Sequence, residues 1–343
     1  MPIAHYAPAV YSRFCCTASA CSDNCCIGWE IDIDPDTARF YDTLPGPDGD
    51  WLRAGISPPG ELPRRFCAGE DGRCPFLDEN NLCGAYLRLG ERAMAEICRE
   101  HPRFHNWCGP FVESGLGLCC EEACRLILTG REPFRLTRLE DLPDDPEGTM
   151  EPLEPLLALR RRAFRLLEER PLPEALEALA RLGYAAQHCP GAPDRAPLPE
   201  TALPPLTGQD GAALVEGFAR LERLTDEWEG LLAQAAEHPE LFGAFTLPGD
   251  PEAEGDYRQL AGYLLYRHLL PFGLDGDLCG PLVLPLAVCR LTAGLERLCG
   301  GGREQRLHLA KLFSKEVEYC EESLPALLPE LTYRQALRER RAE

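Results

Sequence analysis

Long hydrophobic runs are absent from this sequence, and so is a typical secretory leader. No stretch of about 18 uninterrupted apolar residues occurs, so we expect no transmembrane helix. The N-terminus, MPIAHYAPAVYSRF, has no basic segment followed by an apolar one, so we expect no secretory signal. We therefore expect a cytoplasmic protein with reduced thiols, and a disulfide framework is the minor alternative.

Positive charge is scarce. The chain has 35 Lys and Arg residues against 56 Asp and Glu residues, which gives a net charge of −21. Lysine itself is nearly absent, because Lys311 and Lys315 are the only two. Such a charge argues against a nucleic-acid backbone or an anionic membrane as the main partner. We expect neither a nucleic-acid partner nor a membrane partner.

Several common cofactor and metal motifs are missing. There is no G-x-G-x-x-G after a strand, no P-loop and no H-E-x-x-H, which excludes the usual sites for dinucleotides and nucleotides. No C-x2-C pair occurs, although structural zinc sites and bacterial ferredoxins usually contain one. The C-x3-C-x2-C triplet of radical S-adenosylmethionine enzymes is also absent, because Gly28 stands at the third position.

Cysteine, by contrast, is abundant and concentrated. The chain has 18 cysteines, and all but five lie in the first 124 residues. The five later ones lie in leucine-rich segments, where a buried structural role is expected. The early spacing, which includes Cys16-x4-Cys21-x3-Cys25-Cys26, indicates a sulfur-ligated metal. Soft thiolate ligands suit both zinc and iron–sulfur, so spacing alone leaves both open, with buried structural cysteine as the further alternative.

The pattern of the chain indicates two parts. Residues 1–140 are irregular and rich in Gly, Pro and Cys, whereas leucines recur at steps of three and four after a Pro- and acid-rich stretch at 141–155. We predict a mainly α fold, with a Cys-rich, irregular metal-binding N-terminal part that has minor β structure (1–140). A helical, bundle-like part (141–343) follows and is the expected cofactor and substrate part.

Individual elements can be placed from periodicity and from the residues that end them. The expected strands are 29–34 and 112–118. The expected helices are near 90–100 and 119–129 in the first part, and at 153–169, 173–184, 211–238, 257–270, 282–299 and 305–322 in the second.

A series of motifs runs in order along the chain. They are Phe14-x-Cys16-x4-Cys21-x-Asp23-x-Cys25-Cys26-x-Gly28-Trp29-x-Ile31, Cys74-Pro-Phe-Leu, Leu82-Cys83, Cys98-Arg99-x-x-Pro102-Arg103, Leu118-x-Cys120-x-Glu122-Ala123, Tyr263-Leu264-x-Tyr266-Arg267 and Phe313-Ser314-Lys315-Glu316-x-Glu318. In order and spacing the series resembles the flagellin lysine-N-methylase (FliB) family. Its cysteine motifs are also similar to a broader zinc/iron-chelating cysteine domain. Tyr319 departs from the pattern, since a histidine is expected there.

The resemblance implies a function and a set of ligands. It implies methylation of lysine ε-amino groups of flagellin, with S-adenosylmethionine as methyl donor and a [4Fe–4S] cluster, or zinc as the alternative metal. The alternative function is a metal-binding or electron-transfer module without methylase activity, or a zinc-stabilised interaction protein. The implied metal ligands, expected to converge in space, are Cys16, Cys21, Cys25, Cys26, Cys74, Cys83, Cys98 and Cys120.

Methyl transfer to lysine makes a demand on the helical part. An ammonium is no nucleophile, so the lysine must lose a proton and be aimed at the methyl group. Glu316 continues the apolar stripe of residues 309–313 and is expected to point inward, with Arg267 as a structural partner or the substrate lysine as a functional one. The candidate catalytic residues are Glu316, Glu318, Tyr263 and Tyr266.

Overall fold

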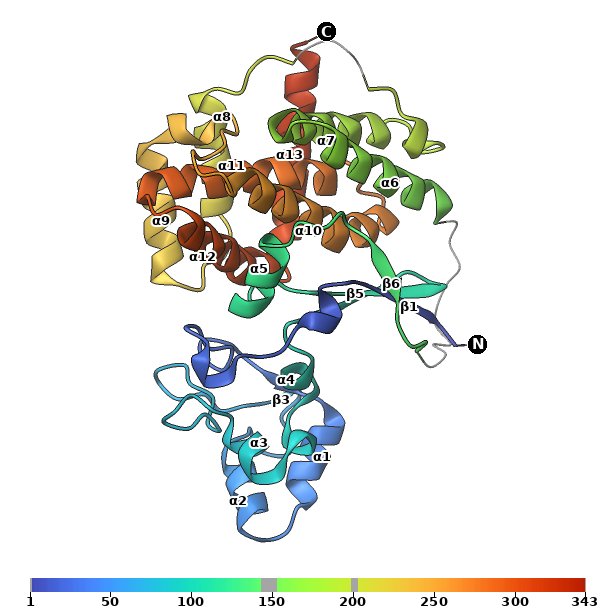
Figure 1. The fold of residues 1–343 in the computed structure, drawn as a ribbon. Coiled ribbons are helices and arrows are strands. Elements are labelled where there is room, and N and C mark those ends of the chain that lie inside the picture. The colour runs from blue at the N-terminus through green and yellow to red at the C-terminus, as the bar shows by residue number, and fades with distance from the viewer. Residues whose placement is uncertain (1, 143–152, 199–202, 343) are drawn as a thin grey trace. The chain divides into compact units, whose positions relative to one another are not determined.

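The computed structural model describes residues 2–142, 153–198 and 203–342. The chain forms two compact units that interleave in the sequence. The cysteine-rich unit comprises Cys15–Phe104 and Cys120–Glu122, and the helical unit comprises Met1–Phe14, His105–Cys119 and Ala123–Glu343. The described residues form thirteen α-helices and only short strands (Figure 1), which confirms the predicted mainly α fold class.

The cysteine-rich unit is built from short elements. Helix α1 (Pro35–Thr43) begins where Asp34 accepts hydrogen bonds from the main-chain nitrogen and the hydroxyl of Thr37, at 2.8 and 2.7 Å. Asp34 also accepts one from the Glu96 nitrogen at 2.8 Å, so a single cap ties two segments together. The remaining elements are η2 (Ala18–Ala20), β2 (Asp32–Ile33), α2 (Gly46–Ala54), β3 (Arg64–Arg65), α3 (Gly84–Leu89), η3 (Glu91–Ala93) and α4 (Glu96–Glu100), with β2 antiparallel to β3.

A small aromatic core holds this unit together. Phe76 is buried and meets the rings of Tyr41, Trp51 and Phe66 edge-on, with centroid distances of 6.0, 4.8 and 5.4 Å. Such edge-to-face pairs add to the free energy gained from buried area. The hydroxyl of Tyr41 donates to the carbonyl oxygen of Ala93 at 2.5 Å, which satisfies its only buried polar group.

The helical unit includes a sheet of four strands, in the order β4-β5-β1-β6. Strand β1 runs parallel to β5, with His5 opposite Val112, and antiparallel to β6, with Ala7 opposite Thr137. The sheet therefore joins segments more than 100 residues apart in the sequence. The strands are β1 (Ala4–Pro8), β4 (Arg103–Trp107), β5 (Phe111–Leu116) and β6 (Leu136–Arg138), with η1 (Tyr11–Arg13) after the first.

Helices make up the rest of this unit, and one of them is enclosed by the others. Helix α11 (Gly280–Cys299) is buried at every position from Gly280 to Glu296 and packs against six other helices and η5. A helix that is buried on every side lies in the middle of a bundle (Figure 1). Around it stand α7 (Leu172–Gln187), α8 (Gly208–Ala219), α9 (Asp226–Glu237), α10 (Ala253–Leu274), α12 (Arg303–Phe313), α13 (Ser323–Arg340) and η5 (Pro239–Phe242). The other elements are α5 (Glu121–Leu128), α6 (Glu154–Glu169), η4 (Pro193–Arg195) and the π-helix η6 (Ser314–Glu318).

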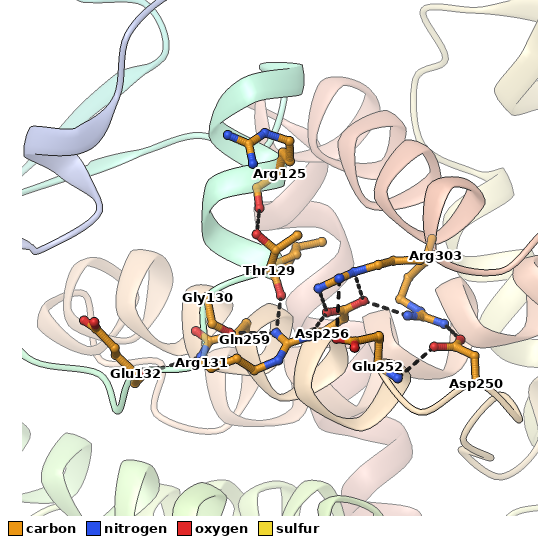
Figure 2. Close-up of polar contacts among 12 residues, drawn as sticks. Arg125, Thr129, Gly130, Arg131, Glu132, Asp250, Glu252, Asp256, Gln259 and Arg303 are labelled. Atoms are coloured by element: carbon orange, nitrogen blue, oxygen red, sulfur yellow. Dashed lines mark hydrogen bonds and ion pairs between the residues drawn. The ribbon is translucent and has the colours of Figure 1, made fainter.

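A buried ion network links the helices of this unit. Asp256 on α10 is 0% exposed and accepts hydrogen bonds from Arg131 at 2.6 Å, from Arg303 at 2.8 and 3.0 Å and from Arg306 at 2.7 Å. Figure 2 shows the bonds that Arg131 and Arg303 make to this carboxylate. Arg306 also bonds Glu296 on α11 at 2.8 and 3.0 Å. Every buried charge here has an opposite partner, so the network fixes α10, α11 and α12 to one another.

Five predicted helices match the structure closely, among them 119–129, which contains α5, and three need correction. Residues 153–169, 173–184, 257–270 and 282–299 lie in α6, α7, α10 and α11. The helix near 90–100 is wrong, because extended backbone at Met94 and Ala95 separates η3 from α4. The helix at 211–238 is two helices, because Thr225 is extended and caps α9 through the nitrogen of Trp228.

Two further predictions differ from the structure, and a third lies mostly outside the described residues. The predicted helix 305–322 stops at Phe313, where the π-helix η6 begins, and α13 follows although the sequence did not indicate it. The strand predicted at 29–34 is only the two residues of β2. The loop predicted at 141–155 falls mostly on residues outside the described ranges.

None of the helices in the described ranges combines the length and the apolar character that crossing a membrane requires.

Candidate functional site

Five of the eight predicted metal ligands lie near one another in the cysteine-rich unit. Cys25 and Cys26 share one loop, and the carbonyl oxygen of Cys26 accepts a hydrogen bond from the Cys74 nitrogen at 2.8 Å. Cys83 stands at the N-cap of α3, and Cys98 lies within α4. Cys74, Cys83 and Cys98 also pack against the aromatic core described above. Four separate segments therefore bring their thiols to one margin of this core.

The thiols of this group, which we call the thiol cluster (Cys25, Cys26, Cys74, Cys83 and Cys98), feel one another's charge. Burial and, after it, the neighbouring thiols of Cys74, Cys83 and Cys25 together raise the pKa of the Cys98 thiol to about 12. The pKa of Cys26 is raised by a hydrogen bond with Cys25, by burial and by nearby Cys25, Cys74 and Cys98. Neutral thiols are thus favoured while no cation is close, because deprotonated ones would repel one another.

The other three predicted ligands have different surroundings. Cys16 is exposed, and its sulfur accepts a hydrogen bond from the Ala18 nitrogen at 3.4 Å. Burial raises the pKa of Cys21, and the carboxylate of Glu121 adds to that rise. Cys120 directly precedes α5 and is partly buried. The structure does not place these three thiols among the neighbours that shift the pKa of Cys26 or Cys98.

The ligand atoms of the thiol cluster are suited to a thiolate-bound metal by their chemistry. Their arrangement is not that of a metal site, because within residues 2–142, 153–198 and 203–342 no three His, Cys, Asp or Glu side chains are placed so that they could hold a metal ion. The thiol cluster nevertheless offers more soft ligands than the four that zinc or one iron–sulfur cluster usually takes from a protein. A cation among these thiols would reverse the repulsion that keeps them protonated.

Glu316 points inward as its position on the apolar stripe predicted, but its partners were not foreseen. It is 0% exposed and accepts hydrogen bonds from the Leu224 nitrogen at 2.7 Å and from the Thr225 hydroxyl at 2.5 Å. Both partners belong to the turn that precedes α9. The expected ion pair between Glu316 and Arg267 is therefore wrong. The carboxylate instead joins η6 to this turn through hydrogen bonds.

Glu318, two residues later, is the carboxylate that Arg267 contacts. Its side chain is fully buried, with the Nε of Arg267 at 3.6 Å and the Nε2 of His268 at 2.6 Å. Tyr263 donates its hydroxyl to the same carboxylate at 2.9 Å. Burial alone would raise the pKa of Glu318, but Arg267 and His268 outweigh it and hold the pKa at about 2. Glu318 is therefore anionic at any physiological pH.

The two predicted tyrosines have separate roles. The hydroxyl of Tyr263 also accepts hydrogen bonds from Arg267 at 2.6 Å and from the Leu118 nitrogen at 3.4 Å. Tyr266 instead donates to the carbonyl oxygen of Ser114 at 2.8 Å. Burial raises the pKa of both phenols well above the usual value, so neither is poised to lose a proton. Tyr263 belongs with Glu318, whereas Tyr266 anchors α10 to the sheet.

Two members of the group around Glu318 were not among the predicted catalytic residues. Burial lowers the pKa of His268, so its imidazole is neutral at pH 7 even beside a carboxylate. The guanidinium of Arg267 lies 4.8 Å from the ring centre of Tyr319, which occupies the position where the family pattern suggested a histidine. The signal for His268 was available: it follows Arg267 directly and lies five residues after Tyr263 on a single helix. We call Tyr263, Arg267, His268 and Glu318 the Glu318 cluster.

Comparison with known proteins gives a consistent set of relatives. The chain is 33% identical over 137 residues to the flagellar biosynthetic protein FliU of Salmonella muenchen, which covers 38% of this chain and 79% of FliU. It is 33% identical over 138 residues to a lysine-N-methylase of Salmonella typhimurium, and 32% identical over 138 residues to one of Salmonella choleraesuis. The matched part spans only 34% of each of these two methylases. No family model and no solved structure matches the chain.

Proposed function

Because the chain belongs to the family that contains FliU and the lysine-N-methylases of Salmonella, we propose that it transfers a methyl group to lysine ε-amino groups of a protein. The observation that carries this proposal is the shared identity of about one third with proteins named for that activity. S-adenosylmethionine is the proposed methyl donor, and flagellin is the proposed substrate. The proposed location is the cytoplasm, where the thiols that such a site needs stay reduced.

The thiol cluster is the proposed metal centre. Cys25, Cys26, Cys74, Cys83 and Cys98 supply the ligands, while Cys16, Cys21 and Cys120 remain candidates from their motifs. A [4Fe–4S] cluster is the proposed occupant and zinc the alternative, since both accept thiolates. When bound, a metal of this kind cross-links four segments and adds positive charge among their sulfurs.

The Glu318 cluster supplies two features that methylation of lysine requires. Glu318 is a fixed anion, which suits the electrostatic holding of a cationic side chain, and its low pKa makes it a weak base. His268, neutral and hydrogen-bonded to Glu318 at 2.6 Å, is the better proton acceptor of the two. We therefore assign proton acceptance to His268 and charge complementarity to Glu318 and Tyr263. Glu316 and Tyr266 receive structural roles instead.

A second function is favoured by the extent of the match. The matched part covers 38% of this chain, so the relatives account for less than half of it. A metal-binding or electron-transfer module without methylase activity would need the thiol cluster but not the Glu318 cluster. The two functions therefore make different demands on the helical unit.

The decisive experiment is a methylation assay on anaerobically purified protein. Incubation with S-adenosylmethionine and flagellin should add about 14 Da per methyl group to lysine residues, as read by mass spectrometry of digested flagellin. His268→Asn should lower the rate by about 10²-fold or more, as expected when a general base is lost. Glu254→Gln, an exposed pair partner on the same helix, serves as the control and should keep the full rate.

The metal is tested separately from the activity. Cys98→Ala should lower the bound iron or zinc, measured by elemental analysis, whereas Cys299→Ser removes an exposed thiol from the helical unit and should leave the metal content unchanged. Full metal content with no methyl addition under any condition would favour the metal-binding module. Methyl addition that survives loss of the metal would separate the thiol cluster from the reaction.

A further inference from the structure

The helical unit contains a small cavity away from both sites described above. It lies among α8, α11 and α13 and has a volume of about 40 Å³. That volume is larger than the roughly 10–15 Å³ needed for one water molecule, and comparable to a few waters or a small functional group. Its apolar lining consists of Leu206, Leu214, Val283, Leu286, Ala287 and Leu331.

The polar part of the lining is unusually positive for this chain. Arg290, Arg334 and Arg338 line the cavity, with Asp210 as the opposing charge and Gln335 as a neutral neighbour. The lining residues therefore carry two positive charges more than negative ones, in a protein whose net charge is −21. A concentration of guanidinium groups against the overall charge indicates a place for an anion.

Arg290 is the central member of this group. It is 7% exposed and its hydrogen bonds go to main-chain oxygens, at 2.8 and 3.2 Å to Phe242 and at 3.1 Å to Asp210. In the described residues it makes no salt bridge, and Asp210 turns one carboxylate oxygen to the nitrogen and hydroxyl of Thr207, both at 2.8 Å. Burial lowers the pKa of Arg290 to about 10, although the nearby carboxylates of Asp210 and Glu177 act in the opposite direction. This buried guanidinium has main-chain oxygens and no carboxylate among its hydrogen-bond partners in the described residues.

The other two arginines are already partly neutralised from outside the cavity. Glu330 pairs with Arg334, and Glu177 pairs with Arg338. Neither glutamate lines the cavity. The cavity is therefore lined by guanidinium groups and by apolar side chains. The combination suits an anion that is small, planar and attached to a hydrocarbon tail.

We propose that this cavity binds the carboxylate of a small aliphatic acid, with the carboxylate at Arg290 and Arg334 and the tail among Val283, Leu286 and Leu331. Guanidinium groups match a planar carboxylate in geometry as well as in charge. The leucine-rich lining favours a hydrocarbon tail over a second polar group. The cavity is too small for a nucleotide or a whole S-adenosylmethionine molecule, so the site is independent of the proposed methyl transfer.

Butyrate is the probe, and calorimetry on the full-length, metal-loaded protein is the measurement. We expect saturable binding of butyrate, and at least tenfold weaker binding of butyramide, which has the same shape without the charge. Equal affinities for the two would show a merely apolar cavity and overturn the proposal. Tighter binding of 2-aminobutyrate would assign the site to amino acids and would also overturn it, as would the absence of butyrate binding.

Two variants and one control locate the site. Arg334→Gln removes a partly exposed guanidinium and should weaken butyrate at least threefold, and Val283→Ile fills the cavity by one methylene and should weaken it likewise. Arg161→Gln removes an exposed arginine that also pairs with a glutamate on its own helix, and should bind butyrate normally. Wild-type affinity in both cavity variants, or equal losses in the control, would place butyrate elsewhere. Arg290→Met should abolish binding, and the two milder variants decide the outcome if it fails to fold.

Discussion

Glu318 is a buried carboxylate with three polar side chains around it. Its carboxylate is enclosed by Arg267, His268 and Tyr263, whereas Glu316 faces a main-chain nitrogen and a hydroxyl. Two glutamates of similar sequence context thus have different chemistry, because an ion pair with Arg267 is made by only one of them. A carboxylate held at a pKa of about 2 makes folding depend on pH.

The pH dependence of stability follows from that value. The pKa of Glu318 in the folded chain is below its ordinary value of 4.5, so its contribution is complete above about pH 4.5 and is lost as the pH falls toward 2. The difference corresponds to about 3 kcal/mol of unfolding free energy. In urea titrations, wild type and Glu318→Gln should differ most at pH 6, and the difference should shrink steadily between pH 4.5 and 2.

The control for this experiment is Glu154→Gln, which changes an exposed carboxylate on α6. Its stability should parallel that of wild type across the same pH range, since exposed ion pairs contribute little. A constant difference between wild type and Glu318→Gln at every pH would contradict the proposed charge pairing and would point to packing alone.

At the scale of elements, the ion network around Asp256 is what fixes α10 to α12 (Figure 2). Asp256→Asn would leave three guanidinium groups, from Arg131, Arg303 and Arg306, short of one anion. Breaking a buried pair from one side costs about 3–5 kcal/mol, because an uncompensated charge remains inside. The unfolding free energy in urea should fall by that amount. Glu254→Gln on the same helix should lower it by less than about 1 kcal/mol, and comparable losses in both variants would refute the assignment.

The elements that the sequence predicted well are those whose signal is local. Leucines at steps of three and four define α6, α7, α10 and α11 without reference to the rest of the chain. The division between α8 and α9 depends on a tertiary contact, the hydrogen bonds of Glu316 to the turn at Leu224 and Thr225. Helix α13 was missed because Pro325 and Pro329 interrupt its pattern, and Pro329 lies inside the helix nonetheless.

The candidate sites show the same limit. The concentration of cysteine predicted a thiol site. Which thiols lie close together depends on how segments far apart in the sequence pack and on which thiols are buried. The choice between Glu316 and Glu318 depends on the π-helix η6, whose extra residue per turn changes which side chains share a face. No periodicity rule places such a turn in advance, so the sequence could place His268 beside Arg267 on one helix but could not pair either residue with Glu318.

At the scale of the whole molecule, the two units should respond differently to metal removal. The cysteine-rich unit has a small core, and its thiol cluster lies at the margin of that core, so a bound metal would contribute directly to its folding. Chelation should therefore raise amide hydrogen exchange in α1 and α2 while α11 stays protected. The comparison is with mock-treated protein at the same pH, and unchanged exchange in α1 and α2 would show that no metal supports this unit.

The enclosure of α11 has a consequence for how this protein can change over time. A helix with one solvent-exposed face tolerates substitutions at every third or fourth position. This period appears when every single substitution in a protein is scored for function. Helix α11 has no such face from Gly280 to Glu296. Its tolerance to substitution should be uniformly low and without a three- or four-residue period, so that the least variable stretch of the chain would be one that holds neither the thiol cluster nor the Glu318 cluster.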